Sequence, residues 1–106
     1  MQKITPEQLQ ERLQQDGPAP VLLDVREDWE FERCHIDNSV HIPMSQIAGE
    51  YDQLDEDTET VVICHHGMRS LQVAQYLEAQ GFSNIANLDG GIDAWAKTVD
   101  PDMEQY

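Results

Sequence analysis

The feature that most constrains the fold is an alternation between short apolar runs and segments with helical periodicity. Val21–Val25 and Thr60–Ile63 are nearly unbroken apolar runs, which is typical of strands covered on both faces of a sheet. Shorter strands are predicted at Val40–Ile42 and Asn84–Leu88. Because strands that alternate with helices build mostly parallel sheets with helices on both faces, the predicted fold class is α/β, as a single domain over residues 1–106.

The helix signals lie between these runs. Thr5-Pro6-Glu7-Gln8 has the form of a capping box with proline at the first helical position, so a helix is expected to begin there and to end before Gly17-Pro18. The clearest helical periodicity runs from Arg69 to Gln80, and Gly81 follows as its cap. Three shorter helices are predicted over residues 28–33, 45–54 and 92–97.

The charge of the chain excludes some partners. Six Lys and Arg residues stand against 21 Asp and Glu residues, which gives a net charge of −15. Phosphate backbones and anionic membrane surfaces would be repelled, so we expect neither nucleic acid nor a membrane as a partner. The acidic residues either keep a small protein soluble or attract a basic partner, and composition leaves both explanations open.

Two further features bear on the compartment. Apolar runs are far shorter than the ~20 residues that cross a bilayer, and the opening MQKITPEQLQ contains no apolar signal-peptide region. The two cysteines, Cys34 and Cys64, do not make a disulfide framework. We therefore expect a cytoplasmic protein.

The chemistry is expected in the loop that joins the strongest strand to the strongest helix. This loop begins at Cys64 and continues through His65, His66, Gly67, Met68, Arg69 and Ser70. Unpaired N–H groups at a helix start form a site for an anion, and they stabilise the thiolate of a cysteine placed there. Gly67 permits a tight turn, Arg69 adds positive charge, and the two histidines add donors that can be charged near neutral pH.

Two other interpretations of this loop remain. Cys64 could be a buried cysteine at the end of a strand, followed by a turn that caps a helix. Cys64, His65 and His66 are also possible metal ligands, but adjacent residues seldom converge on one ion and no second Cys or His cluster completes a site. We therefore expect no metal and no cofactor.

Four segments of the chain, in the expected order, resemble the motifs of the rhodanese family. They are Asp24-Val25-Arg26-Glu27, Cys34-His35-Ile36 followed by Ile42-Pro43, Cys64-His65-His66-Gly67-Met68-Arg69-Ser70, and Leu88-Asp89-Gly90-Gly91-Ile92 with Trp95. The resemblance covers residues 4–98 and implies a doubly wound sheet of about five mainly parallel strands.

The resemblance also implies a sulfurtransferase. Cys64 would take sulfur from a donor such as thiosulfate, hold it as a persulfide against the N–H groups of residues 65–70, and pass it to cyanide, a thiol or a protein acceptor. Asp24 and Arg26 would form a charged pair that supports the loop region. Gly90-Gly91 and Trp95 are expected to serve the turn and the packing.

Two positions depart from the family pattern. His65 and His66 stand where many thiosulfate-using relatives carry Arg or Lys after the cysteine, which favours a protein persulfide as the donor. Cys34 occupies a position usually held by glycine, where it is either a buried, inert residue or a second thiol that resolves an oxidised Cys64.

The resemblance leaves two rival functions. Cysteine-dependent phosphatases and arsenate reductases are related, but such phosphatases have five residues between the cysteine and the arginine, whereas four separate Cys64 from Arg69. A persulfide relay or partner-binding module is the second rival. Trp95–Tyr106 resembles the ends of rhodanese domains attached to enzymes that activate ubiquitin-like sulfur carriers, so a desulfurase or a sulfur carrier is a possible partner.

Overall fold

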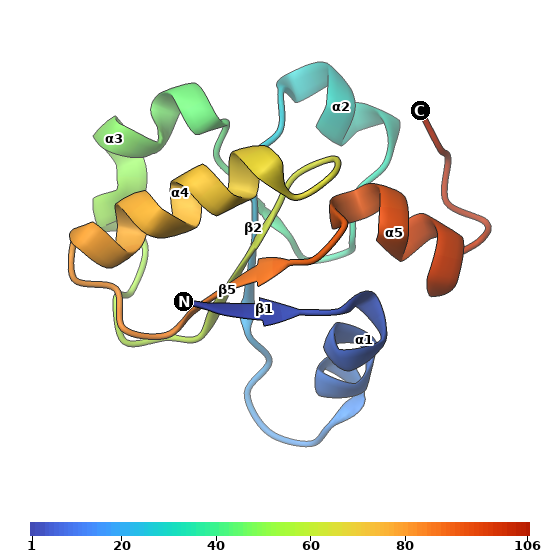
Figure 1. Ribbon diagram of the computed structural model, residues 1–106, viewed down its shortest axis with the longest axis horizontal. Coiled ribbons are helices and arrows are strands. Elements are labelled where there is room, and N and C mark those ends of the chain that lie inside the picture. Colours follow the sequence, from blue (N-terminus) through green and yellow to red (C-terminus); the bar gives the residue numbers. More distant parts are fainter.

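In the computed structural model, which describes residues 1–106, five strands form one parallel sheet in the order β1-β5-β4-β2-β3 (Figure 1). The strands are β1 (Gln2–Ile4), β2 (Val21–Asp24), β3 (Val40–His41), β4 (Thr60–Ile63) and β5 (Ile85–Leu88). The parallel α/β class and the five strands implied by the family resemblance are confirmed.

The first strand was not predicted from the sequence. Gln2, Lys3 and Ile4 form a short edge strand whose residues pair with Ala86, Asn87 and Leu88 of β5. Gln2 and Lys3 are exposed, so the segment lacks the apolar run that marks a buried strand. Its pairing depends on residues at the far end of the chain, and local sequence patterns cannot reveal such a pairing.

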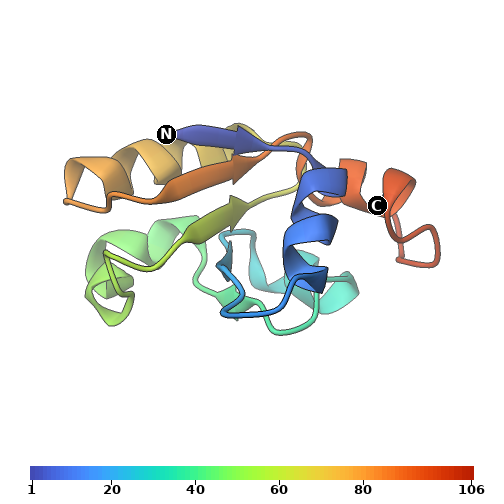
Figure 2. The same cartoon turned by 90° about the horizontal axis from the view of Figure 1, so that it is seen from below.

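The helices cover both faces of the sheet. They are α1 (Pro6–Gln14), α2 (Asp28–Arg33), α3 (Ile47–Glu50), α4 (Met68–Ala79) and α5 (Gly91–Thr98). In Figures 1 and 2, α3 and α4 lie to one side of the strands, and α1 and α5 lie to the other. None of these helices combines the length and the apolar character that a membrane crossing requires.

Two of the helix predictions can be compared in detail. The capping box is confirmed, since the Gln8 N–H donates to Thr5 Oγ1 and the Thr5 N–H donates to Gln8 Oε1. The helix predicted over residues 45–54 is instead one turn of α-helix, α3, between two short 3-10 turns at Met44–Gln46 and Tyr51–Gln53. This segment is thus a succession of single turns rather than one continuous helix.

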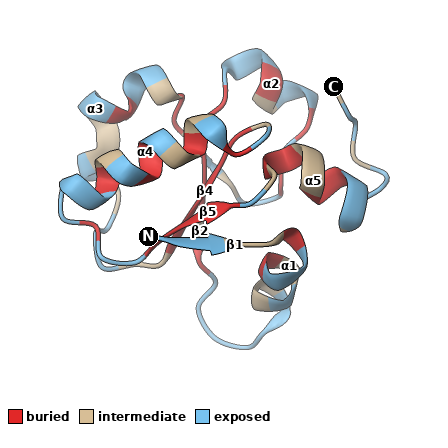
Figure 3. Cartoon of the chain, in the orientation of Figure 1, coloured by how far each residue is buried: buried red, intermediate tan, exposed pale blue.

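The core consists of two apolar clusters, one on each face of the sheet. The cluster beneath α4 contains Cys64 with Leu23, Val62 and Leu77. The cluster beneath α1 and α5 contains Cys34, together with Leu9, Val61 and Trp95. Figure 3 shows β2, β4 and β5 buried along most of their length, which explains why they were the most readily recognised strands.

The register places the expected chemistry at one end of the sheet. Asp24 at the end of β2 lies beside Ile63 at the end of β4. Cys64 follows Ile63, and the turn into α4 begins there. Asp24 and Cys64 therefore lie at the carboxyl edge, where open α/β sheets bind their ligands.

Candidate active site

The loop from Cys64 to Gly67 turns back on the cysteine sulfur. Cys64 is buried, with 1% of its surface exposed, and the Gly67 N–H donates to its Sγ at 3.0 Å. Gly67 has a φ of +104°, a left-handed conformation that favours glycine, and it caps the start of α4. The loop thus directs one backbone donor, the Gly67 N–H, at the sulfur.

The predicted loop residues divide into an inner and an outer set. Gly67 and Ser70 are buried beside Cys64, whereas His66 and Met68 are exposed and His65 and Arg69 are half-buried. The inner residues determine the surroundings of the sulfur. The outer ones form the rim of the loop.

Asn87 is a site residue that the sequence analysis did not single out. The Cys64 thiol donates to Ser70 Oγ at 3.2 Å, the Ser70 hydroxyl donates to Asn87 Oδ1, and Asn87 Nδ2 donates to the Gly67 carbonyl at 3.1 Å. Asn87 is the only amide in the buried strand β5, and a lone polar residue near the end of an apolar strand was the signal available.

The start of α5 holds the loop from the other side. The Ile92 N–H donates to the Cys64 carbonyl at 2.8 Å, and the Asp93 N–H donates to the His65 carbonyl at 3.0 Å. This contact requires glycine at position 91, because a Cβ there would lie 2.4 Å from both carbonyl oxygens. Gly91 therefore permits the close approach of a helix start to the active-site loop.

Arg69 is paired with an acid that the sequence analysis did not identify. Its guanidinium donates to both carboxylate oxygens of Glu30 on α2, at 2.6 and 2.8 Å. This hydrogen bonding lowers the pKa of Glu30 to about 2, although burial acts in the opposite direction. The positive charge that Arg69 was expected to add to the loop is therefore balanced by Glu30.

Asp24 and Arg26 form the expected charged pair, and both side chains are fully buried. Arg26 Nη2 lies 2.7 Å from Asp24 Oδ2 and also donates to the Cys34 carbonyl at 2.6 Å. Burial opposes the charge, but the hydrogen bond with Asp24 raises the pKa of Arg26. The pair ties the end of β2 to the segment that follows α2.

Tyr106 is a third residue that the sequence analysis did not place at the site. Its ring stacks on His65, with 4.0 Å between the ring centroids and 11° between the planes. Its hydroxyl accepts a hydrogen bond from Arg26 Nη1 and donates one to Glu30 Oε2, both at 2.9 Å. Burial raises the pKa of Tyr106 to about 12.

The surroundings of His65 bear on the charge of its ring. Burial, and then the neighbouring His66, lower the pKa of His65, while Asp93 and Glu30 act in the opposite direction. This lowering of the pKa favours the neutral form of the His65 ring.

The second cysteine lies apart from the loop. Cys34 is buried in the cluster beneath α1 and α5, whereas Cys64 belongs to the cluster beneath α4, and both thiols are free. The Cys34 sulfur lies 4.0 Å from Arg26 Nη1. This placement favours the inert interpretation of Cys34 over the resolving thiol.

One group of side chains could hold a metal ion. The ligand atoms of His65, His66 and Asp93 lie within 4.8 Å of one another, and Cys64 is not among them. Asp93 is already paired with Lys97 at 3.0 Å, and this contact lowers the pKa of Asp93. The group therefore differs from the Cys64, His65 and His66 set that the sequence suggested.

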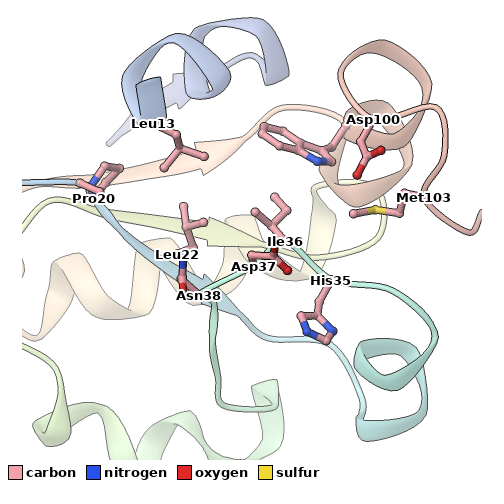
Figure 4. A pocket seen from close by; sticks show the side chains of 11 residues that line it. Leu13, Pro20, Leu22, His35, Ile36, Asp37, Asn38, Asp100 and Met103 are labelled. Carbon is pink, nitrogen blue, oxygen red and sulfur yellow. The ribbon is translucent and has the colours of Figure 1, made fainter. Parts of the chain in front are cut away.

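The largest cavity lies away from this loop. It has a volume of about 380 Å³ and is lined by residues of α1, β2, α5 and the segments 35–38 and 100–103 (Figure 4). None of residues 64–70 lines it. Because the loop residues 64–70 surround the Cys64 sulfur and none of them lines the cavity, we place the candidate site at the loop.

Comparison with known proteins gives independent evidence on the family of this chain. Residues 5–98 match the family of rhodanese-like domains. The chain is 41% identical over 103 residues to the thiosulfate sulfurtransferase GlpE of Pseudomonas syringae pathovar syringae, an alignment that covers 97% of this chain and 94% of that protein. It is 40% identical over 105 residues to the probable adenylyltransferase/sulfurtransferase MoeZ of Mycobacterium tuberculosis, covering 97% of this chain but only 26% of that longer protein.

A solved structure agrees with these relatives. The rhodanese-related protein of Thermoplasma volcanium superposes with a TM-score of 0.85 at 33% identity, covering 93% of this chain and 94% of that one. Fold, motif order and family match thus point the same way. The chain belongs to the rhodanese family.

Proposed function

We propose that this chain is a sulfurtransferase that carries sulfur as a persulfide on Cys64. The observation that supports this most directly is the Gly67 N–H directed at the Cys64 sulfur from 3.0 Å. A backbone donor at the start of α4 stabilises negative charge, both on the thiolate and on a persulfide. The name of the relative GlpE, a thiosulfate sulfurtransferase, supports the same activity.

The reaction has two balanced steps. The Cys64 thiolate attacks the outer sulfur of a donor such as thiosulfate, the sulfur–sulfur bond of the donor breaks, and sulfite leaves with the electron pair. An acceptor such as cyanide or a thiolate then attacks the terminal sulfur of the persulfide. The Cys64 thiolate leaves with the electron pair, so the enzyme returns to its first state without an external oxidant.

The neighbours of Cys64 have distinct parts in these steps. Loss of the thiol proton removes the hydrogen bond to Ser70 Oγ and leaves the thiolate facing the Gly67 N–H. Asn87 holds both Ser70 and the Gly67 carbonyl. The Gly67 N–H therefore stays aligned with the sulfur while the charge on the sulfur changes. The Arg69–Glu30 pair fixes the first turn of α4 against α2.

The charge of the chain bears on which sulfur donor it uses. All four arginines and Lys97 are ion-paired, which leaves few cations free to attract thiosulfate to a chain of net charge −15. We therefore propose that a protein persulfide of the cysteine-desulfurase type is a better donor than thiosulfate, and that a basic protein or a small thiol is the preferred acceptor. The two free thiols suit a reducing compartment, which supports a cytoplasmic location.

The phosphatase alternative has less support. A phosphatase loop uses its arginine to bind the phosphate dianion, but both ends of the Arg69 guanidinium are engaged by Glu30. Four residues between Cys64 and Arg69 also form a smaller loop than phosphatases use.

The test of the proposed function is the intact mass of the reduced protein after incubation with thiosulfate or with a persulfide-loaded cysteine desulfurase. The expected result is a gain of one sulfur that is lost again on addition of cyanide. Cys64→Ser should abolish the gain. The matched variant Cys34→Ser should keep it, because Cys34 lies in the other core cluster. A folded Cys64→Ser protein that still gains and releases sulfur would refute the assignment.

A further inference from the structure

The segment after α5 returns to the active-site loop. We call residues 99–106 the strap; it runs from the end of α5 to a point beside α2 (Figure 1). Val99, Met103 and Tyr106 pack against the cluster beneath α1 and α5, and Glu104 pairs with Arg33 at 2.9 Å. The strap thus reaches the site through one side chain, Tyr106.

We propose that Tyr106 is a positioning residue for sulfur transfer, whose ring holds His65 and with it the start of the active-site loop. The inference rests on the proposed function of Cys64. It extends the site beyond the loop and the strands to a segment that carries none of the chemistry itself.

The ring contact determines where the first residue after Cys64 lies. The Asp93 N–H holds the His65 main chain at 3.0 Å, and the Tyr106 ring covers the His65 side chain at 4.0 Å. His65 is therefore fixed by α5 on one side and by the strap on the other. Because the adjacent Cys64 shares its peptide bond, a shift of His65 would move the sulfur away from the Gly67 N–H, and displacements near 1 Å reduce rates strongly.

The hydroxyl and the edge of the ring make further contacts. The hydroxyl bridges Arg26 Nη1 and Glu30 Oε2, two buried groups of opposite charge, at 2.9 Å each. Hydrogen bonds to charged groups are stronger than hydrogen bonds between neutral groups. The ring edge also meets Trp29 at a centroid distance of 5.7 Å. The hydroxyl thus adds stability to the strap, whereas the ring, through its contacts with Trp29 and His65, holds the loop.

These two roles can be separated by two substitutions. Tyr106→Phe keeps the ring and removes both hydroxyl bonds, whereas Tyr106→Ala removes the ring as well. We expect both to lower the Tm by several degrees, since each loses hydrogen bonds to charged groups. Only Tyr106→Ala should lower kcat at 25 °C, by about tenfold, with KM changed less than about twofold. Glu104→Ala, which removes the ion pair between the strap and Arg33, is the matched control and should keep the wild-type kcat.

NMR spectroscopy can detect the stacking of the Tyr106 ring on His65 directly. A stacked tyrosine ring shifts the ring protons of His65 upfield in an NMR spectrum, and this shift should persist in Tyr106→Phe and disappear in Tyr106→Ala. Circular dichroism at 25 °C establishes that each variant is folded.

The outcomes are distinct. Loss of kcat and of the His65 shift in Tyr106→Ala, with both retained in Tyr106→Phe, supports the proposal. Wild-type kcat in a folded Tyr106→Ala protein, equal losses of kcat in both variants, or a loss confined to KM would overturn it. If the wild-type chain forms no persulfide in the same assay, the proposed function itself fails and the inference with it.

Discussion

Gly91→Ala tests whether the contact between α5 and the loop is as tight as the geometry indicates. Gly91 has a φ of +63°, and an added Cβ would meet the Cys64 and His65 carbonyl oxygens at 2.4 Å. Both obstacles are backbone atoms, which cannot rotate away as a side chain would. The substitution must therefore separate the start of α5 from the loop.

The stability that Gly91→Ala loses has three contributions. The left-handed conformation costs a residue with a Cβ about 1–2 kcal/mol. Separation removes two backbone hydrogen bonds, from the Ile92 and Asp93 N–H groups, each with a net contribution of about 1 kcal/mol. Residual crowding adds to this, so the free energy of unfolding should fall by about 3–4 kcal/mol. That is a large part of the ~5–15 kcal/mol that stabilises a typical domain.

Urea denaturation measures the loss, and Gly17→Ala is the matched control. Gly17 also has a positive φ, +99°, but a Cβ there would have no atom within 4 Å. The control therefore reports the conformational cost alone, about 1–2 kcal/mol. Gly91→Ala should lose more stability than Gly17→Ala and most of its sulfur transfer. If the two variants were equally stable, or if Gly91→Ala transferred sulfur at the wild-type rate, the close approach would have no part in the site.

Three further predictions concern other contacts of the site. The pKa of Glu30 lies at about 2 in the folded protein against an ordinary 4.5, so its ion pair adds stability above pH 4.5 that is lost as the pH falls to about 2; acid titration of Glu30→Gln should lack this loss, on the order of 3 kcal/mol. Asn87→Ala should lower the free energy of unfolding by about 1–3 kcal/mol and slow sulfur transfer, because the Ser70 hydroxyl and the Gly67 carbonyl lose a buried partner. A urea midpoint of this variant equal to that of the wild type would contradict the prediction. Thiosulfate turnover should rise between low and moderate salt, because salt screens the repulsion from the acidic surface, and a fall would show that a local positive field dominates.

Local signals revealed most of the fold. The buried strands β2, β4 and β5 have the apolar runs that mark central parallel strands, and α1 has its capping box. The strand β1 has neither signal. It is short, polar and at an edge, and it exists because β5 offers a free row of backbone groups to pair with.

The sequence also indicated the position and chemistry of the loop, but not the partners of its charged residues. Arg69 and Glu30 are 39 positions apart, and Arg26 and Tyr106 are 80 positions apart. No local pattern connects residues so distant, and their pairing decides whether a charge is free or balanced. This is why the sequence did not reveal that Glu30 balances the charge of Arg69, and why Tyr106 was not recognised as part of the site.

The strand order has a consequence for how the chain folds. β1 is made first, yet its only partner in the sheet is β5, which is made after every other strand. The strap reaches Arg26 from equally far along the chain. Such non-local contacts slow folding, because a long loop must close before they form. During synthesis, the central strands β2 and β4 can pair early, whereas the first strand waits unpaired and the surroundings of Cys64 are completed only when the strap emerges.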